Sequence, residues 1–343
     1  MTVVESGASD IHFSVGHHPA IRTGGSLVFL GKNPVLTPKD LESFVSLMVN
    51  EKQRKELLEN GEVDFAYDFE GKARFRCNAF RQRGFLGIAM RVVQPRIKTL
   101  EELNLPDALK TFALRQQGFF LVVGPTGHGK STTLAAMVDV INHETSRHII
   151  TIEDPIESLF IPDKSIIDQR EVSYDTKSFN NALRAMFRQD VDVAMIGEMR
   201  DADSIAIAVT AAETGHLVLS SLHTNNASQT VDRIIDSFPS ANQNQIRLQL
   251  AGSLIGIFSQ RLIPRLSGGL IPAYELLIVN TAVRNLIREA RTHEIDIVVE
   301  TSSEDGMVSL NSSLLNLVRQ SEISLDSAMT FSMRPKTLME LAK

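Results

Sequence analysis

The segment Gly124–Thr132 has the residue types and the spacing of a phosphate-binding loop. Its first eight residues fit the pattern G-x-x-x-x-G-K-[ST]. In such a loop the backbone N–H groups face phosphate oxygens, the lysine reaches the β- and γ-phosphates, and the hydroxyl ligates Mg²⁺. Lys130 and Ser131 would take the last two roles. We expect the whole loop to bind nucleotide, namely Gly124, Pro125, Thr126, Gly127, His128, Gly129, Lys130, Ser131 and Thr132.

Two acidic segments follow, each at the end of an apolar run. Glu153 lies in Thr151–Glu157, where a carboxylate can orient an attacking water. An acidic turn is the alternative, because pairs of acids are common. Glu198 comes after the apolar run Val193–Ile196, as in a Walker B segment whose carboxylate holds Mg²⁺. Asp192, at the start of that run, is the weaker candidate.

Two histidines, His216 and His223, bracket the apolar run Leu217–Leu222. An isolated histidine is usually structural. A pair at the two ends of one strand can instead sense phosphate or bridge to a neighbouring group. A zinc site is not expected, because no third soft ligand accompanies the pair.

Arginines are concentrated in the first third of the chain, and a solvated basic face is the simplest interpretation. The functional interpretation is an arginine finger, donated to the nucleotide of a neighbouring subunit. Arg76 and Arg91 are the better candidates because they end strand-like stretches, although the residues leave the choice open. The full set is Arg74, Arg76, Arg81, Arg83 and Arg91.

The elements around these residues are those of an α/β protein. Phe119–Val123 predicts a buried parallel strand before the loop, and Thr132–Val138 predicts a helix after it. These flanks make a chance glycine-rich turn a poor alternative. The alternation of strands and helices predicts a doubly wound sheet with its ligand at the carboxyl ends of the strands. Further strands are expected at His148–Ile152, Val193–Ile196 and Leu217–Leu222.

Three regions are expected: a small α+β domain at 1–93, a linker at 94–105, and the α/β core at 106–343, mostly helical from about residue 240. In the first domain a single helix is predicted over Pro38–Asn60, from the proline at its first position to Gly61. Strands are predicted at Ile11–Ser14, Leu27–Leu30, Phe65–Phe69, Ala73–Phe80 and Leu86–Val93.

Composition is that of an ordinary globular protein, with 343 residues, 43% of them hydrophobic, and a net charge of −6. The single cysteine, Cys77, excludes a disulfide framework and a four-cysteine zinc site within the chain. No apolar stretch has the length of a membrane span, and the N-terminus has no signal-peptide pattern. We therefore expect a cytoplasmic protein that a partner recruits if it acts at a membrane.

Taken together, these motifs resemble those of the secretion-superfamily ATPases, the ring hexamers of type II secretion, type IV pili and conjugation systems. The closest branch is the one that retracts type IV pili, and the resemblance covers nearly the whole chain. The extension branch usually carries a four-cysteine zinc motif, which this chain lacks. The matching segments are Ala8–His12, Ala73–Phe80, Gly124–Thr133, Thr151–Glu157, Gly197–Asp201, His216–His223 and Ala282–Glu289.

This resemblance implies a RecA-like P-loop core with a PAS-like N-terminal domain, and a hexameric motor that hydrolyses ATP with Mg²⁺ to drive pilus retraction and twitching motility. It makes Glu153 the catalytic carboxylate, Glu198 the Walker B acid, and His216 with His223 the His box. The implied partners are further copies of the chain and an inner-membrane platform protein at the pilus base, with a paralogous accessory ATPase left open and no nucleic acid. His128 departs from the family, which usually has a small residue there.

Other functions stay open at this point. A secretion or conjugation ATPase of the same superfamily would carry the same motifs. A weakly active accessory hexamer that binds the true motor is a second alternative, although intact Lys130, Glu153 and Glu198 argue against it. A DNA-dependent translocase is a third, and the acidic net charge argues mildly against it.

Overall fold

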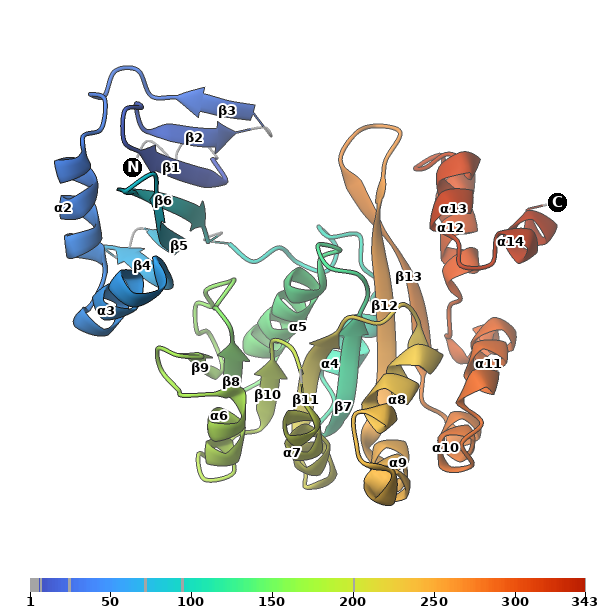
Figure 1. The fold of residues 1–343 in the computed structure, drawn as a ribbon. Helices are drawn as coiled ribbons and strands as arrows, with labels where there is room; N and C mark the ends of the chain where they lie inside the picture. Colours follow the sequence, from blue (N-terminus) through green and yellow to red (C-terminus); the bar gives the residue numbers. More distant parts are fainter. Residues whose placement is uncertain are drawn as a thin grey trace. The chain divides into compact units, whose positions relative to one another are not determined.

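Two compact units make up the chain in the computed structural model, which describes residues 6, 8–23, 26–70, 73–93, 96–199 and 201–342 (Figure 1). One unit comprises Met1–Arg96 with Glu157–Leu159, and the other comprises Ile97–Ile156 with Phe160–Lys343. No helix in the described part of the chain has both the length and the apolar character needed to cross a bilayer.

The first unit is a six-stranded antiparallel sheet with helices on one face. Residues alternate along its strands, so that Phe75 and Cys77 are buried while Arg76 between them is exposed. The buried face packs with Leu41 and Leu57 of the two helices. The strand order is β3 (Ser26–Phe29), β2 (Ala20–Thr23), β1 (Asp10–Ser14), β6 (Phe85–Val92), β5 (Ala73–Gln82) and β4 (Glu62–Phe69).

The single helix predicted over Pro38–Asn60 is wrong, because the structure has two helices, α2 (Pro38–Met48) and α3 (Glu51–Asn60). Asn50 starts the second helix with a capping box. Its side chain accepts a hydrogen bond from the backbone N–H of Gln53, and the Gln53 side chain accepts one from the N–H of Asn50. A side chain that satisfies free helix N–H groups makes a new helix start favourable.

The second unit contains the predicted parallel sheet. Its strand order is β13, β12, β7, β11, β10, β8 and β9, and all neighbouring pairs are parallel except β12 with β13. Four strands fall where the sequence predicts them, within a residue at either end. The bounds are β7 (Gly118–Val123), β8 (His148–Glu153), β9 (Ile166–Glu171), β10 (Val193–Ile196), β11 (Leu217–Leu222), β12 (Leu254–Pro264) and β13 (Leu270–Ile278).

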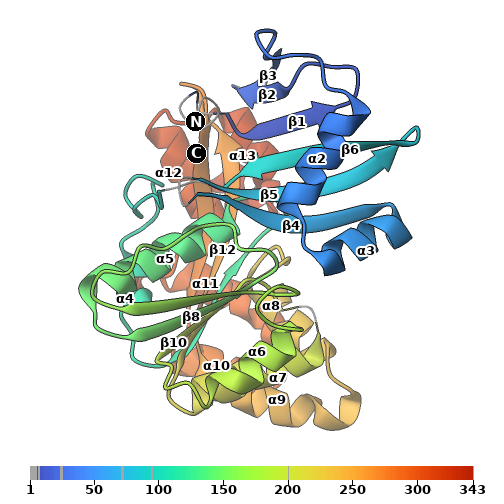
Figure 2. The same ribbon diagram turned by 90° about the vertical axis from the view of Figure 1, so that its left-hand side faces the viewer.

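Helices cover both faces of this sheet (Figure 2). Strand β7 is buried throughout, with Phe120 and Val122 facing α4 and α5, and Phe119 and Leu121 facing the helices from α6 to α11. This two-sided burial explains the continuous apolar runs in the sequence. The helices are α4 (Ala108–Ala113), α5 (Lys130–Glu144), α6 (Phe179–Met186), α7 (Ala202–Glu213), α8 (Ala227–Asp236), α9 (Ser240–Ser253), α10 (Thr281–Arg288) and α11 (Ile295–Thr301).

A long hairpin of β12 and β13 interrupts the region expected to be mostly helical from residue 240. Beyond it the chain is helical as expected. Helices α12 (Leu310–Arg319), α13 (Leu325–Phe331) and α14 (Pro335–Leu341) pack with Ile263 and Ile271 near the tip of the hairpin. The hairpin thus joins the nucleotide-binding sheet to the C-terminal helices.

The segment expected to be a linker, 94–105, is largely part of the second unit. Residues 94 and 95 lie outside the described residues. Leu100 and Leu105 are buried with Leu109 and Phe112 of α4, so the change of unit falls at Arg96 and Ile97.

Candidate nucleotide site

Four adjacent parallel strands bring the predicted residues to one edge of the sheet. Strands β7, β11, β10 and β8 lie side by side and run in the same direction (Figure 1). The P-loop follows β7, His223 follows β11, Glu198 lies just after β10, and Glu153 ends β8. These groups therefore gather at the carboxyl ends of the strands, where open α/β sheets bind their ligands.

Glycines give the loop its shape. Gly124, Gly127 and Gly129 have φ angles of 143°, 79° and 81°, in the region that side chains disfavour. At Gly124 a Cβ atom would lie 2.4 Å from the backbone oxygen of Gln260, so the loop passes close against strand β12. Helix α5 begins directly after Gly129 and directs its free N–H groups toward the loop.

The ammonium group of Lys130 is held inside this loop. It donates hydrogen bonds to the carbonyl oxygens of Gly124 (2.9 Å) and Pro125 (3.0 Å), and it lies 3.1 Å from Nδ1 of His223. Only 7% of the residue is exposed. Since an ammonium can only donate, Nδ1 of His223 accepts and the imidazole proton is on Nε2.

That tautomer lets His223 connect two predicted site residues. Its Nε2 lies 3.4 Å from Oε2 of Glu198, so one imidazole bridges Lys130 and Glu198. The hydroxyl of Thr126 in the loop is 3.3 Å from Nδ1 of the same ring. Lys130, His223 and Glu198 therefore form one connected polar group.

Glu153 is buried beside this group and is oriented by its own strand. The hydroxyl of Thr151 donates to its Oε1 at 2.7 Å, and the amide of Gln169 on β9 donates to the same oxygen at 3.4 Å. Gly197, at the end of β10, lies close by, since a Cβ atom there would be 3.6 Å from Cα of Glu153. The carboxylate thus has a fixed direction at the end of β8.

The weaker Walker B candidate, Asp192, is at the opposite end of its strand. Its carboxylate accepts a hydrogen bond from the backbone N–H of His148 at 2.8 Å, at the start of β8. The structure therefore separates Asp192 from the P-loop and leaves Glu198 as the acid at that edge.

His216 is likewise not brought to the P-loop of its own chain, because it stands before β11. The whole of β11 separates the two histidines, because one precedes the strand and the other follows it. His216 contacts the carbonyl of Ala211 through Nδ1 (3.0 Å), and its ring packs edge-on against Phe187. Within one chain this is the environment of a structural histidine.

The predicted arginines Arg76 and Arg91 face each other across β5 and β6 on the exposed face of the first unit's sheet. Arg91 donates from Nε to Oδ1 of Asp10 at 2.9 Å, whereas the Arg76 side chain makes no ion pair with a described residue. Like charges directly opposite each other destabilise a sheet. Arg91 is thus paired within its own unit, whereas Arg76 is exposed on the same face of the sheet.

The comparisons with known proteins agree with this geometry. The family model for type II/IV secretion system proteins matches residues 1–270. The chain belongs to this family. It is 42% identical over 324 residues to the type IV pilus retraction ATPase PilT of Pseudomonas aeruginosa, covering 94% of each chain. It is 40% identical over 328 residues to the type IV pilus ATPase PilU of the same organism, covering 95% of this chain and 86% of that protein.

A solved structure extends the comparison to the fold. The crystal structure of the pilus retraction motor PilT with bound ADP superposes with a TM-score of 0.92 at 47% identity, covering 99% of this chain and 97% of that one. The resemblance to the retraction branch and the expected fold class are therefore confirmed.

Sequence reasoning missed the polar residues that hold this family's motifs in place. Thr151 was detectable, because residues two apart in a strand share a face and it stands two before Glu153. Gln169 and Gln260 carry no local signal. They reach the site only through the pairing of β9 with β8 and of β12 with β7.

Proposed function

We propose that this protein is an ATP-hydrolysing motor that retracts type IV pili and so drives twitching motility. The observation that carries the proposal is the connected group of Lys130, His223 and Glu198 beside the buried Glu153. The high identity to a retraction ATPase along almost the whole chain supports it.

The residues present suit ATP and Mg²⁺. The strained glycines and the start of α5 form a backbone cradle for phosphates, and Lys130 adds a positive charge within it. Ser131 is exposed in the first turn of α5, and Glu198 lies at the same edge of the sheet. These two would hold Mg²⁺, which when bound neutralises charge on the phosphates.

Each residue of the site then has a defined task. Lys130 binds phosphate by exchanging carbonyl and imidazole partners for phosphate oxygens. Glu153, fixed by Thr151, orients the attacking water and accepts its proton. His223 couples the position of Lys130 to that of Glu198, because it contacts both.

We further propose that the active form is a homohexamer in which Arg76 and Arg91 act on a neighbour's nucleotide. The exposed, like-charged pair supports this role. A hinge at the boundary near Arg96 would let one unit move against the other during the cycle. His216 is proposed as a structural residue of its own chain.

The working place of such a motor is the cytoplasmic side of the inner membrane, at the pilus base. We propose recruitment by the pilus platform protein, with a paralogous ATPase as an optional partner and no nucleic acid. One organism has two pilus ATPases that are similar to this chain, PilT and PilU, so a second candidate is an accessory pilus ATPase that depends on another motor.

Two strains separate the candidates: one lacks only the gene for this protein, and the other also lacks the gene for the other motor. A retraction motor should restore pilus retraction in both strains. The purified protein should also hydrolyse ATP without DNA. An accessory ATPase should restore retraction only when the strain also contains the other motor. Failure in both backgrounds would refute both candidates.

A further inference from the structure

Strand β12 contains none of the motifs described above, yet its residues form hydrogen bonds with the P-loop. The side-chain amide of Gln260 donates to the carbonyl of His128 at 2.6 Å, and its oxygen accepts from the hydroxyl of Thr133 at 2.7 Å. The backbone N–H of Leu262 donates to Nδ1 of His128 at 2.9 Å. Two β12 residues thus hold the loop and the first turn of α5.

Gln260 also packs closely against the first and last glycines of the loop. Its backbone oxygen is the atom that a Cβ at Gly124 would meet at 2.4 Å, and its amide nitrogen is the atom that a Cβ at Gly129 would meet at 3.1 Å. The residue is 2% exposed. One buried glutamine therefore contacts the beginning, the end and the following helix of the loop.

His128 lies within the loop, and its side chain faces β12. Because the Leu262 N–H donates to Nδ1, the imidazole must be unprotonated at that nitrogen. Burial, together with the cations Arg261 and Lys130, lowers the pKa of His128 and favours this neutral form. A small residue at 128 would keep the carbonyl bond to Gln260 and lose the bond to Leu262.

We propose that Gln260 and His128 are positioning residues that fix the P-loop on strand β12 in the shape that binds nucleotide. The inference rests on the proposed function in taking a nucleoside phosphate as the ligand. Neither residue is assigned a contact with the reacting atoms, so their loss should act on nucleotide binding before it acts on chemistry.

The test compares Gln260→Met and His128→Ala with the wild-type protein. Three quantities are measured: the affinity for a fluorescent ADP analogue, KM and kcat for ATP, and the midpoint of thermal unfolding without nucleotide. In His128→Ala, which loses one hydrogen bond, we expect the ADP affinity to fall and KM to rise by roughly tenfold, and in Gln260→Met, which loses two, by at least as much. The value of kcat should change by less than about threefold.

Two further variants make the result specific. Gln249→Met removes a glutamine hydrogen bond of similar length, to Glu213 on the neighbouring helix, and should leave ADP affinity unchanged. His128→Asn keeps a side-chain acceptor for the Leu262 N–H and should recover part of the affinity lost in His128→Ala. A purely structural role would instead lower the unfolding midpoint without separating KM from kcat. If Gln260→Met does not fold, the two His128 variants decide the question.

The outcomes separate the inference from the proposed function. ADP affinity and KM within twofold of wild type in both Gln260→Met and His128→Ala would overturn the inference and leave the function intact. A wild-type protein that binds ADP but does not hydrolyse ATP would refute the proposed function, and weaker ADP binding by the variants would still support the inference. A wild-type protein that does not bind ADP would overturn both.

Discussion

The two carboxylates of the site, Glu153 and Glu198, differ in what surrounds them. Glu153 is buried and its Oε1 is held by Thr151 and Gln169. Glu198 is more exposed and faces the imidazole of His223. A fixed, buried carboxylate suits the orientation of water, whereas an accessible one at the loop suits a cation.

This difference predicts distinct defects for the two amide variants. Glu153→Gln should bind ATP and turn it over ~10²–10⁴ times more slowly, since one catalytic positioning group is lost. Glu198→Gln should hydrolyse ATP slowly at a low Mg²⁺ concentration, and its rate should rise as the Mg²⁺ concentration is raised. Turnover measured across a Mg²⁺ series checks both, and equal Mg²⁺ responses would contradict the division of roles.

At the scale of single residues, the sequence predicts those site residues that belong to a local motif. The P-loop, Glu153, Glu198 and His223 meet at one edge because each stands at the carboxyl end of an apolar run. His216 belongs to the same motif but lies at the other end of its strand. The sequence already places the two histidines at opposite ends of the predicted strand Leu217–Leu222, which the structure has as β11.

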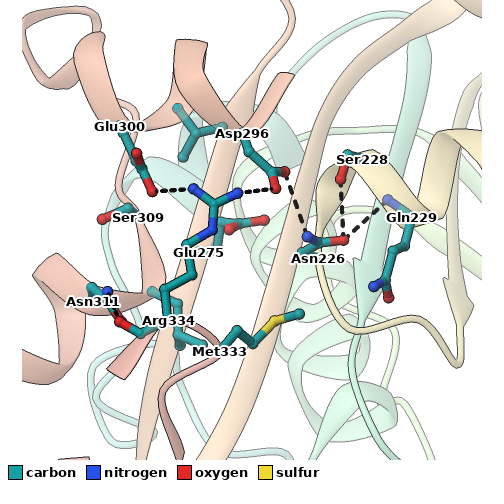
Figure 3. A pocket seen from close by; sticks show the side chains of 12 residues that line it. Asn226, Ser228, Gln229, Glu275, Asp296, Glu300, Ser309, Asn311, Met333 and Arg334 are labelled. Carbon is teal, nitrogen blue, oxygen red and sulfur yellow. Dashed lines mark hydrogen bonds and ion pairs between the residues drawn. The ribbon is translucent and has the colours of Figure 1, made fainter. Parts of the chain in front are cut away.

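At the scale of secondary-structure elements, Glu275 of strand β13 lines a polar pocket of about 250 Å³ (Figure 3). The guanidinium of Arg334 lies between Asp296 (2.6 Å) and Glu300 (2.7 Å) across this pocket. Burial raises the pKa of Glu275 to about 7, and nearby Asp296 adds to the shift, while the N–H of Ala227 and the cation Arg261 oppose it.

The raised pKa of Glu275 predicts a pH-dependent stability. Between its unfolded value of 4.5 and its folded value of about 7, the folded state binds the proton more tightly, so this residue destabilises the fold increasingly as pH rises. The difference in the free energy of unfolding between Glu275→Gln and wild type should therefore favour the variant by about 2 kcal/mol more at pH 8 than at pH 5. Urea unfolding at both pH values measures this, and a pH-independent difference would contradict it.

Helix α10 carries most of the segment Ala282–Glu289, which resembles the retraction branch of the family. Val283, Leu286 and Ile287 are buried, whereas Asn285 and Arg288 are exposed. An exposed pair that contributes little to packing is free to contact the pilus machinery.

Changing that exposed pair should separate motor action from hydrolysis. Asn285→Ala with Arg288→Ala is expected to leave ATP turnover near wild type and to stop retraction in cells. Leu286→Ala, the buried counterpart on the same helix, should destabilise the protein by about 3 kcal/mol and impair both activities. Retraction that survives the double change would show that α10 serves packing alone.

For the whole molecule, the four central strands β7, β8, β10 and β11 were predictable because parallel strands buried on both faces leave continuous apolar runs. The β12–β13 hairpin was not, since its pairing with β7 is set by contacts more than a hundred residues apart. The break at Asn50 was missed because no glycine or proline marks it, while the capping bonds with Gln53 decide the helix start.

Assembly can be tested by mixing subunits with complementary defects. Arg76→Ala subunits keep the P-loop, and Lys130→Ala subunits keep the arginine. If Arg76 acts on a neighbour's nucleotide, mixed rings should hydrolyse ATP faster than either variant alone, because some interfaces contain both intact groups. Turnover measured across mixing ratios gives the answer, and mixtures that never exceed the better variant would rule out Arg76 as a residue acting in trans.

The central claim is that nucleotide hydrolysis at this P-loop powers pilus retraction. Its most direct measurement is pilus retraction in a strain lacking the gene, supplied with either wild-type protein or Lys130→Ala at equal levels. We expect the wild-type protein to restore retraction and Lys130→Ala to restore none, since the variant removes the phosphate-binding charge while the loop glycines keep their backbone. Retraction by Lys130→Ala at the wild-type rate, or no retraction with either protein, would contradict the account.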